Sequence, residues 1–154
     1  MSQETATVRA TFPSLEWFQA LKDIVNGQEA YRRIGICDTT MGIKIPDLQK
    51  FYVVTFEAFE VADVKEATEE EVEDCDFWLE APYARWKEML ENIKANGKAD
   101  LHHTLNTLDL EDPEGFARSH DGLRRDAFYR FNQSLQFFFD ASSAIDTVFL
   151  QQGT

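Results

Sequence analysis

The sequence predicts a single α+β domain, and three observations lead to this prediction. The chain has 154 residues, the size of one domain with one core. Several segments alternate apolar and polar residues, as strands with one buried face do. Other segments repeat apolar residues every three or four positions, as helices that pack on a sheet do. We therefore expect a flexible polar N-terminus at residues 1–11 and one domain at residues 12–150.

The first expected element is a helix over residues 13–27. Pro13 and Ser14 favour a helix start, and Gly27 favours a helix end. The next two segments, "YRRIGICDTTMGIKI" and "FYVVTFEAFEV", are rich in β-forming residues, and the turn signal Pro46-Asp47 separates them. These two segments are predicted to pair as a hairpin.

Residues 57–76 contain ten acidic side chains and a single lysine. Repulsion between the carboxylates predicts a solvated loop or strand end, and the Asp-x-Asp-x-Asp-Gly spacing of a calcium loop is missing. We therefore predict no metal site there. The strand "CDFWLEA" follows, and in it Cys75, Phe77 and Leu79 alternate with Asp76 and Trp78. This alternation predicts one buried face, with Trp78 pointing outward.

Two further helices are expected in the second half of the chain. The first covers residues 82–97, with Trp86, Met89, Leu90 and Ile93 on one face. Residues 101–110 predict a short helix that runs into an extended segment, and residues 111–122 predict a polar loop. Asp121 is the expected N-cap of a long final helix.

The final helix carries an unusual number of aromatic rings in "RRDAFYRFNQSLQFFFDASSA". At 100° per residue, Phe137 faces away from an inward stripe. The stripe either packs on the sheet or forms one wall of a cavity, with Arg124 at the mouth to hold a carboxylate or phosphate. Its members are Phe128, Phe131, Leu135, Phe138 and Phe139.

Charge and composition exclude several classes of partner. The net charge is −13, and residues 51–100 hold 14 acidic against 5 basic side chains. Such a surface repels nucleic acids and disfavours stable association with anionic membranes. No segment has the length and apolar character of a membrane span or a leader peptide, so we expect a cytoplasmic protein. Cys37 and Cys75 are isolated, and no glycine-rich loop precedes a helix, so no cofactor is expected.

The order of these elements resembles the sterol carrier protein 2-like family over residues 12–146. The resemblance rests on "DFWLEAPYARWKEMLENI", where a strand runs into a helix that carries Trp86, and on "LEWFQALKDIVNGQEAYRRIG". It implies a mostly antiparallel five-stranded sheet, covered by helices on one face, around an apolar tunnel for sterols, fatty acids or acyl-CoA. It brings no catalytic residues. By matching position it implies a tunnel wall of Phe18, Leu21, Phe56, Phe77, Leu79, Trp86, Leu90, Phe128, Phe131, Leu135 and Phe138.

Three functions are compatible with the sequence. The first is non-catalytic binding of a bulky apolar molecule in a ring-lined cavity, with Arg124 at its edge. The second is an interaction module that dimerises through Phe137 or Trp78. The third is a small acid/base enzyme on a cone-shaped fold such as that of the nuclear transport factor 2-like group. Its candidate residues are His102, His103 and His120, with Asp100 or Asp121.

Overall fold

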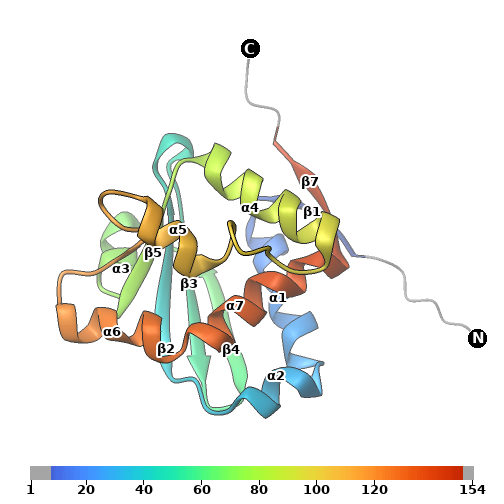
Figure 1. Cartoon of the computed structure of the whole chain (residues 1–154), viewed down its shortest axis with the longest axis horizontal. Helices are drawn as coiled ribbons and strands as arrows, with labels where there is room; N and C mark the ends of the chain where they lie inside the picture. Colours follow the sequence, from blue (N-terminus) through green and yellow to red (C-terminus); the bar gives the residue numbers. More distant parts are fainter. Residues whose placement is uncertain (1–7, 151–154) are drawn as a thin grey trace, which may run out of the picture.

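The computed structural model describes residues 8–150, which form a five-stranded sheet with helices packed against it and a two-stranded sheet at one side (Figure 1). The order in the large sheet is β4-β3-β2-β5-β6, and only the β2–β5 pair is parallel. The predicted α+β class with a mostly antiparallel sheet is therefore confirmed. The strands are β2 (Thr39–Ile45), β3 (Lys50–Glu57), β4 (Glu60–Glu66), β5 (Phe77–Glu80) and β6 (Ala117–Arg118).

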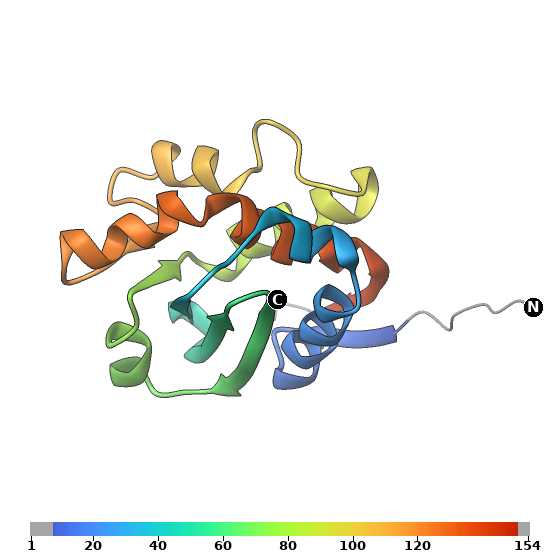
Figure 2. The ribbon, with the colours of Figure 1, turned by 90° about the horizontal axis from the view of Figure 1, so that it is seen from below.

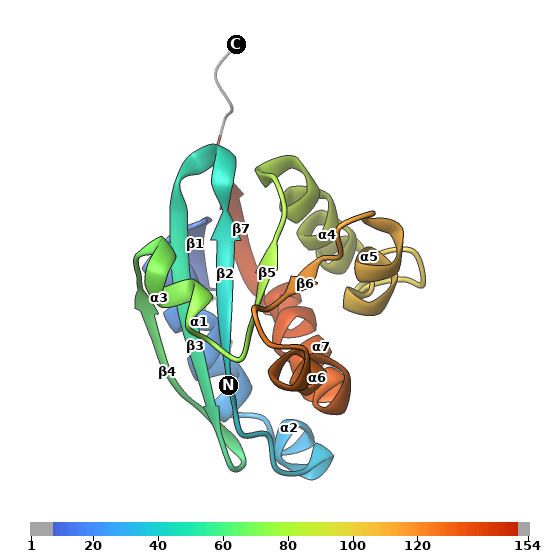
Figure 3. The same ribbon diagram turned by 90° about the vertical axis from the view of Figure 1, so that its left-hand side faces the viewer.

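The helices form a layer on one face of the sheet, and one short helix lies on the other face. In Figure 3 the short helix α3 (Glu69–Glu73) lies in front of the strands and α1 lies behind them. No helix within residues 8–150 is long and apolar enough to cross a bilayer. The helical layer consists of α1 (Leu15–Asn26), α2 (Glu29–Ile34), α4 (Tyr83–Asn96), α5 (Leu105–Glu111), α6 (Gly122–Arg130) and α7 (Asn132–Asp140).

Several elements form where the sequence predicted them. The Ser14 hydroxyl accepts a hydrogen bond from the Trp17 amide at the start of α1, and Gly97 ends α4 in the left-handed conformation. The β2–β3 hairpin forms around a 3-10 turn, η1 (Pro46–Leu48). The Asp121 carboxylate caps α6 by accepting from the Leu123 amide. The local signals at these chain positions were sufficient because each acts within four residues.

The prediction of one long final helix is wrong, because the helix is interrupted at Phe131. The backbone there has φ −106° and ψ 17°, and α7 starts at Asn132 as a separate helix that continues into the 3-10 turn η2 (Ala141–Ala144). The break lets α6 place Phe128 on Phe77 at 5.7 Å between ring centroids. It lets α7 place Phe138 on Phe56 at 5.5 Å. The two rings therefore pack on the sheet from two separate helices.

Four other predictions need correction. Residues 1–7 lie outside the described residues, but Val8–Phe12 is not an unstructured end, since it forms β1 and pairs in parallel with β7 (Ile145–Phe149). The segment from residue 31, expected to be a strand, begins as helix α2, and the strand starts only at Thr39. Residues 108–110, expected to be extended, belong to helix α5, and the loop expected at 111–122 contains the short strand β6.

The acidic segment was predicted to be a solvated loop or strand end. Its first part is strand β4, and its second part, where a loop was expected, is helix α3. A capping box between Thr68 and Glu71 starts α3. Lys44 of β2 holds the helix on the sheet, with its Nζ 2.7 Å from Glu69 Oε2 and 2.9 Å from Glu73 Oε2. The carboxylates of Glu69 and Glu73 therefore share a cation whose side chain is only 10% exposed, which relieves part of the repulsion that predicted a loop.

Gly42 makes the close approach of α3 possible. A Cβ at this position would lie 2.7 Å from Val72 Cγ1 and 2.9 Å from Trp78 Cβ. Val53, Val72, Cys75 and Trp78 form a small second core between α3 and the sheet. The prediction that Trp78 points outward is therefore wrong, since helix α3 covers the face that the alternation assigned to solvent.

Candidate ligand-binding site

A groove lies between α2 and α7, which run side by side in the helical layer (Figure 2). Its main hollow has a volume of about 670 Å³, and a second hollow of about 170 Å³ adjoins it. Both hollows are lined by Phe137 and Asp140, so we treat them as one feature and call it the α2–α7 groove. The main hollow is lined by Ala30, Ile34, Asn132, Gln133, Gln136, Phe137 and Asp140, and the second also by Gln28, Gly97, Ala141, Ser143 and Ala144.

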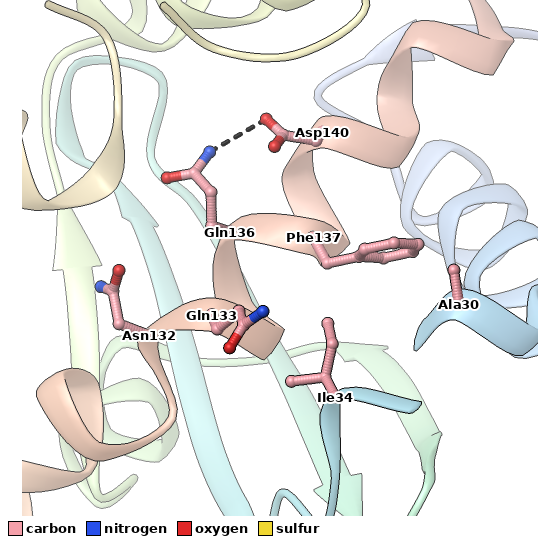
Figure 4. A pocket seen from close by; sticks show the side chains of 7 residues that line it. All are labelled: Ala30, Ile34, Asn132, Gln133, Gln136, Phe137 and Asp140. Carbon is pink, nitrogen blue, oxygen red and sulfur yellow. Dashed lines mark hydrogen bonds between the residues drawn. The ribbon is translucent and has the colours of Figure 1, made fainter. Parts of the chain in front are cut away.

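Helical spacing explains how these side chains come together. Asn132, Gln136 and Asp140 are four residues apart on α7 and form one ridge. Gln133 and Phe137 form the neighbouring ridge, which faces α2 (Figure 4). The opposite face of α7 carries the buried side chains that pack toward the sheet. The groove is thus the outward face of the aromatic helix.

The apolar part of the groove is centred on Phe137. This ring is half-buried and points toward Ala30 (Figure 4). It lies 5.7 Å from the ring of Tyr31. Ile34 completes the apolar surface from the end of α2. A half-buried ring between two aliphatic side chains gives an apolar ligand a continuous apolar contact surface.

Buried polar groups lie under this surface. Tyr31 is fully buried, and its hydroxyl has no hydrogen-bond partner within the described residues. Burial raises the pKa of Tyr31, and the nearby Cys37 adds to that shift. Burial also raises the pKa of the Cys37 thiol to about 12. A thiol with so high a pKa is protonated at neutral pH and is a poor nucleophile.

The polar rim of the groove is built around Asp140. Its Oδ1 accepts hydrogen bonds from Gln136 Nε2 at 2.9 Å and from the Ala99 amide at 3.0 Å. Gln136 Oε1 in turn accepts from the Leu105 amide at 2.9 Å, so both side chains fasten the α4–α5 loop to α7. Burial raises the pKa of Asp140, although these hydrogen bonds and Lys98 oppose the shift.

Asn132 lies at the other end of the rim. Its Nδ2 is buried and has no hydrogen-bond partner among residues 8–150. Buried amide groups are usually paired, so this atom is an available hydrogen-bond donor at this end of the groove. The groove therefore has an apolar centre and polar groups at both ends.

The side chains predicted to line a tunnel lie mainly in the interior. The inward stripe of the final segment is confirmed at Phe128, Leu135, Phe138 and Phe139, whereas Phe131 is partly buried and stacks under the Arg130 guanidinium. Contact of these residues with a ligand stays a prediction. The predicted tunnel residues that are at most 2% exposed are Phe18, Leu21, Phe56, Phe77, Leu79, Trp86, Leu90, Phe128, Leu135 and Phe138.

Arg124 is placed at a different hollow from Phe137. It is exposed on α6, and it donates to Asp76 Oδ1 at 3.2 Å and to the Asp74 carbonyl at 2.8 Å. With Phe56 and several acidic and threonine side chains, it lines a polar hollow of about 780 Å³ at the end of β2 and β3. An anion held by Arg124 would meet the carboxylates of Asp38 and Asp76 there.

The proposed dimer contacts are also separated. Trp78 is only 6% exposed and donates from Nε1 to Glu80 at 3.0 Å, while Phe137 lies in the groove between α2 and α7. The two rings are on opposite sides of the molecule, because α3 covers one face of the sheet and α7 the other. A single contact surface through both rings is excluded.

The imidazole rings of His103 and His120 are bound to carboxylates at the surface. His103 Nδ1 lies 2.7 Å from Asp100 Oδ1, and its Nε2 lies 2.9 Å from Glu88 Oε2. His120 Nε2 lies 3.1 Å from Glu73 Oε1, and its ring lies 5.1 Å from the Trp78 ring at an interplanar angle of 56°. The exposed His102 is tied to Asp100 only through its backbone amide. None of these histidines lines the α2–α7 groove or the Arg124 hollow.

The contacts of His103 with two carboxylates predict that the stability of the fold depends on pH. The Asp100 and Glu88 carboxylates raise the pKa of His103 above 6.5, and the hydrogen bond from His103 is the largest cause that lowers the pKa of Asp100 to about 2. The contacts of His103 with Asp100 and Glu88 therefore contribute fully to the free energy of unfolding between about pH 4 and 6.5. This contribution is lost as the pH rises through the pKa of folded His103. We expect the urea midpoint of the wild type to fall toward that of His103→Gln between pH 6 and 9.

The exposed neighbour provides the control for this experiment. His102→Gln should keep the pH dependence of the wild type, because the His102 side chain makes neither of the two contacts. A difference between wild type and His103→Gln that stays constant from pH 6 to 9 would contradict the assignment.

Sequence reasoning missed the α2 side of the groove. It assigned residues 31–34 to a strand, although Ala30 and Ile34 are four residues apart and follow an acidic helix-start residue, Glu29. It correctly placed Phe137 on the outward face of the final helix, but it did not predict helix α2, which forms the other wall of the groove.

Comparisons with known proteins identify the fold. No protein-family model and no curated protein matches the chain. The crystal structure of sterol carrier protein 2 is similar with a TM-score of 0.59 and 19% identity, over 86% of this chain and 97% of that one. The solution structure of a conserved hypothetical protein from Thermus thermophilus, described as possibly a sterol carrier protein, is similar with a TM-score of 0.59 and 18% identity, over 93% and 97%. The chain has the sterol carrier protein 2-like fold.

Proposed function

We propose that this chain, which has the fold of sterol carrier proteins, binds and carries a bulky apolar molecule of the sterol or fatty-acyl class without catalysing a reaction on it. One observation carries the proposal: the half-buried ring of Phe137 lies between Ala30 and Ile34 in a groove of about 670 Å³. Volumes of roughly 300–1,000 Å³ are usual for small-molecule sites. The apolar body of the ligand rests on this ring.

The interior aromatic layer is the second part of the proposed site. Leu135 and Phe138 lie on the face of α7 opposite Phe137, and with Phe56 and Phe77 of the sheet they form the wall behind the groove. A ligand that enters between α7 and the sheet replaces contacts among these rings. Deep burial of the ligand therefore requires α7 to move, whereas binding in the groove does not.

The chemistry of the described residues supports binding without catalysis. The ring nitrogens of His103 are both held by surface carboxylates, and the Cys37 thiol is buried with a raised pKa. The net charge of −13 supports a small molecule rather than a nucleic acid or an anionic lipid surface as the partner.

Replacement of Phe137 tests the proposal. We expect Phe137→Ala to weaken binding of a fluorescent sterol such as dehydroergosterol about tenfold, because a ring contact of this kind contributes about 1–2 kcal/mol. Binding is measured by energy transfer from tryptophan to the sterol. Native mass spectrometry of the wild type, purified from its own host, should also show a retained apolar molecule that the variant loses.

Phe51→Ala is the matched control, since Phe51 is a half-buried ring packed against the second core on the other face of the sheet. It should bind the sterol as the wild type does. Equal losses in both variants, or no binding of sterols and fatty acids by the wild type, would refute the proposed function.

A further inference from the structure

We infer that the α2–α7 groove selects ligands by their head group: it takes an apolar molecule whose head donates a hydrogen bond and carries no negative charge, and it rejects carboxylates and phosphates. Alcohols and amines have such heads. The inference rests on the proposed function and narrows its ligand class, because fatty acids and acyl-CoA are then poor ligands at this site and hydroxylated lipids are good ones.

The charge of the lining disfavours an anionic head. The described residues that line the two hollows include one ionisable side chain, Asp140, and no lysine or arginine. A carboxylate or phosphate moved from water into the groove would lose hydration and gain no ion pair. It would also lie near the carboxylate of Asp140, and like charges in a partly buried site repel more strongly than they do in water.

The nearest cations do not change this balance. Lys98 is close enough to lower the pKa of Asp140, but it does not line either hollow. Lys94 Nζ is bound to the carbonyls of Ser143 and Ile145, and Arg33 of α2 is paired with Glu29 at 3.3 Å. The cations around the groove are therefore outside it or already bound to acceptors.

Asp140 also has a free acceptor for a head that donates a hydrogen bond. Both hydrogen bonds that Asp140 accepts from the described residues go to Oδ1, from Gln136 Nε2 and from the Ala99 amide. These two donors fix the carboxylate in one orientation and leave Oδ2 without a donor among residues 8–150. A ligand hydroxyl or amine can donate a hydrogen bond to Oδ2. A charge-assisted hydrogen bond of this type is stronger than a neutral one.

The groove also has the length for an amphiphile with a tail. Asn132 and Asp140 are eight residues apart on α7, which corresponds to about 12 Å along the helix axis. Phe137 lies between them and is shared by both hollows. A head bound at Asp140 therefore places the tail on Phe137, Ala30 and Ile34.

Asn132 is the alternative anchor for an acidic head, since its buried Nδ2 has no partner among the described residues. A single neutral amide does not compensate for the hydration that a carboxylate loses. A water or an ester oxygen is enough to satisfy the amide donor of Asn132. We therefore assign the head group to Asp140 and not to Asn132.

The test compares three ligands with the same tail: dodecanol, dodecylamine and dodecanoate. Each is titrated into the full chain at pH 8, below its aggregation concentration, and binding is followed by calorimetry. We expect the alcohol and the amine to bind at least tenfold more tightly than the acid. Dodecanoate binding within twofold of dodecanol would overturn the inference while the proposed function stands. Binding of none of the three would overturn the inference, and it would overturn the proposed function as well if dehydroergosterol also fails to bind.

Asp140→Asn gives a change of sign that a loss of folding would not imitate. The amide oxygen can keep the bonds from Ala99 and Gln136, and the new Nδ2 presents a donor where Oδ2 presented an acceptor. We expect dodecanoate to bind at least threefold more tightly and dodecylamine at least threefold more weakly. Asp126→Asn, which removes an exposed carboxylate from α6, is the control for net charge and should change neither.

Asn132→Leu completes the test. We expect it to leave the preference for the alcohol over the acid unchanged. If it abolishes binding of dodecanoate in a wild type that binds the acid well, the head group belongs at Asn132 and the assignment to Asp140 is overturned.

Discussion

Phe138→Ala is expected to lower the free energy of unfolding by about 3–5 kcal/mol, the range usual for removing a fully buried phenylalanine. The Phe138 ring is 0% exposed. It meets Phe56 edge-to-face at 5.5 Å and Phe139 at 5.2 Å between centroids. Removing it leaves a cavity between α7 and the sheet. Urea unfolding at 25 °C measures the loss.

The neighbouring ring provides the comparison for this variant. Phe137 is on the same helix but half-buried, so Phe137→Ala should cost no more than about 1.5 kcal/mol. The comparison shows whether the interior is filled. If Phe138→Ala costs less than about 1 kcal/mol, the ring already borders an open space, and the interior wall rather than the groove is the primary site.

Asp109→Ala is expected to be the second most damaging change, at about 3 kcal/mol, because it breaks a buried ion pair and leaves the partner without a counter-ion. The Asp109 side chain is 6% exposed, and both its oxygens lie 3.1 Å from Arg125 Nη2. It also accepts from the Ala117 amide at 2.9 Å and from the Tyr129 hydroxyl at 3.1 Å. The pair therefore joins α5, β6 and α6.

Urea unfolding of Asp109→Ala and Asp126→Ala separates a buried from an exposed carboxylate. Asp126 forms an exposed pair with Arg130 at 3.7 Å, so its removal should change the free energy of unfolding by less than about 0.5 kcal/mol. Similar small losses in both variants would show that the network around Asp109 does not hold the helices to β6.

The strands and helices that the sequence predicted correctly are those whose pattern is local and long enough to repeat. Helix α1 and helix α4 each have a start residue, a periodic face and a terminal glycine within one short segment. The pairing of β1 with β7 joins the two ends of the described chain, Val8 with Ile145, and neither strand has a distinctive pattern of its own. Such a pairing is decided by the tertiary structure.

The acidic segment shows why charge alone was a poor guide. Repulsion among its carboxylates predicted a loop, but Lys44, a residue of another strand, supplies the cation that lets α3 form. For the same reason Trp78 was placed wrongly, since α3 covers the sheet face that the alternating pattern left exposed. Both errors come from a neighbour that the sequence does not place.

The candidate site could be predicted only in part. The sequence separated the inward stripe from Phe137, and the structure confirms that separation. It did not predict the groove, because a groove needs two walls and the second wall, α2, was assigned to a strand. The pairing of the Arg124 guanidinium with Asp76 likewise depends on how α6 meets the sheet.

A titration of the ¹⁵N-labelled chain with dodecanol, followed by NMR, tests most directly whether an apolar ligand binds in the α2–α7 groove. We expect saturable shifts of the backbone amides of Ala30, Ile34, Gln136 and Phe137, with the amides around Arg124 unchanged. Shifts that gather around Arg124 and Asp76, or a spectrum that does not change with ligand, would contradict binding in this groove.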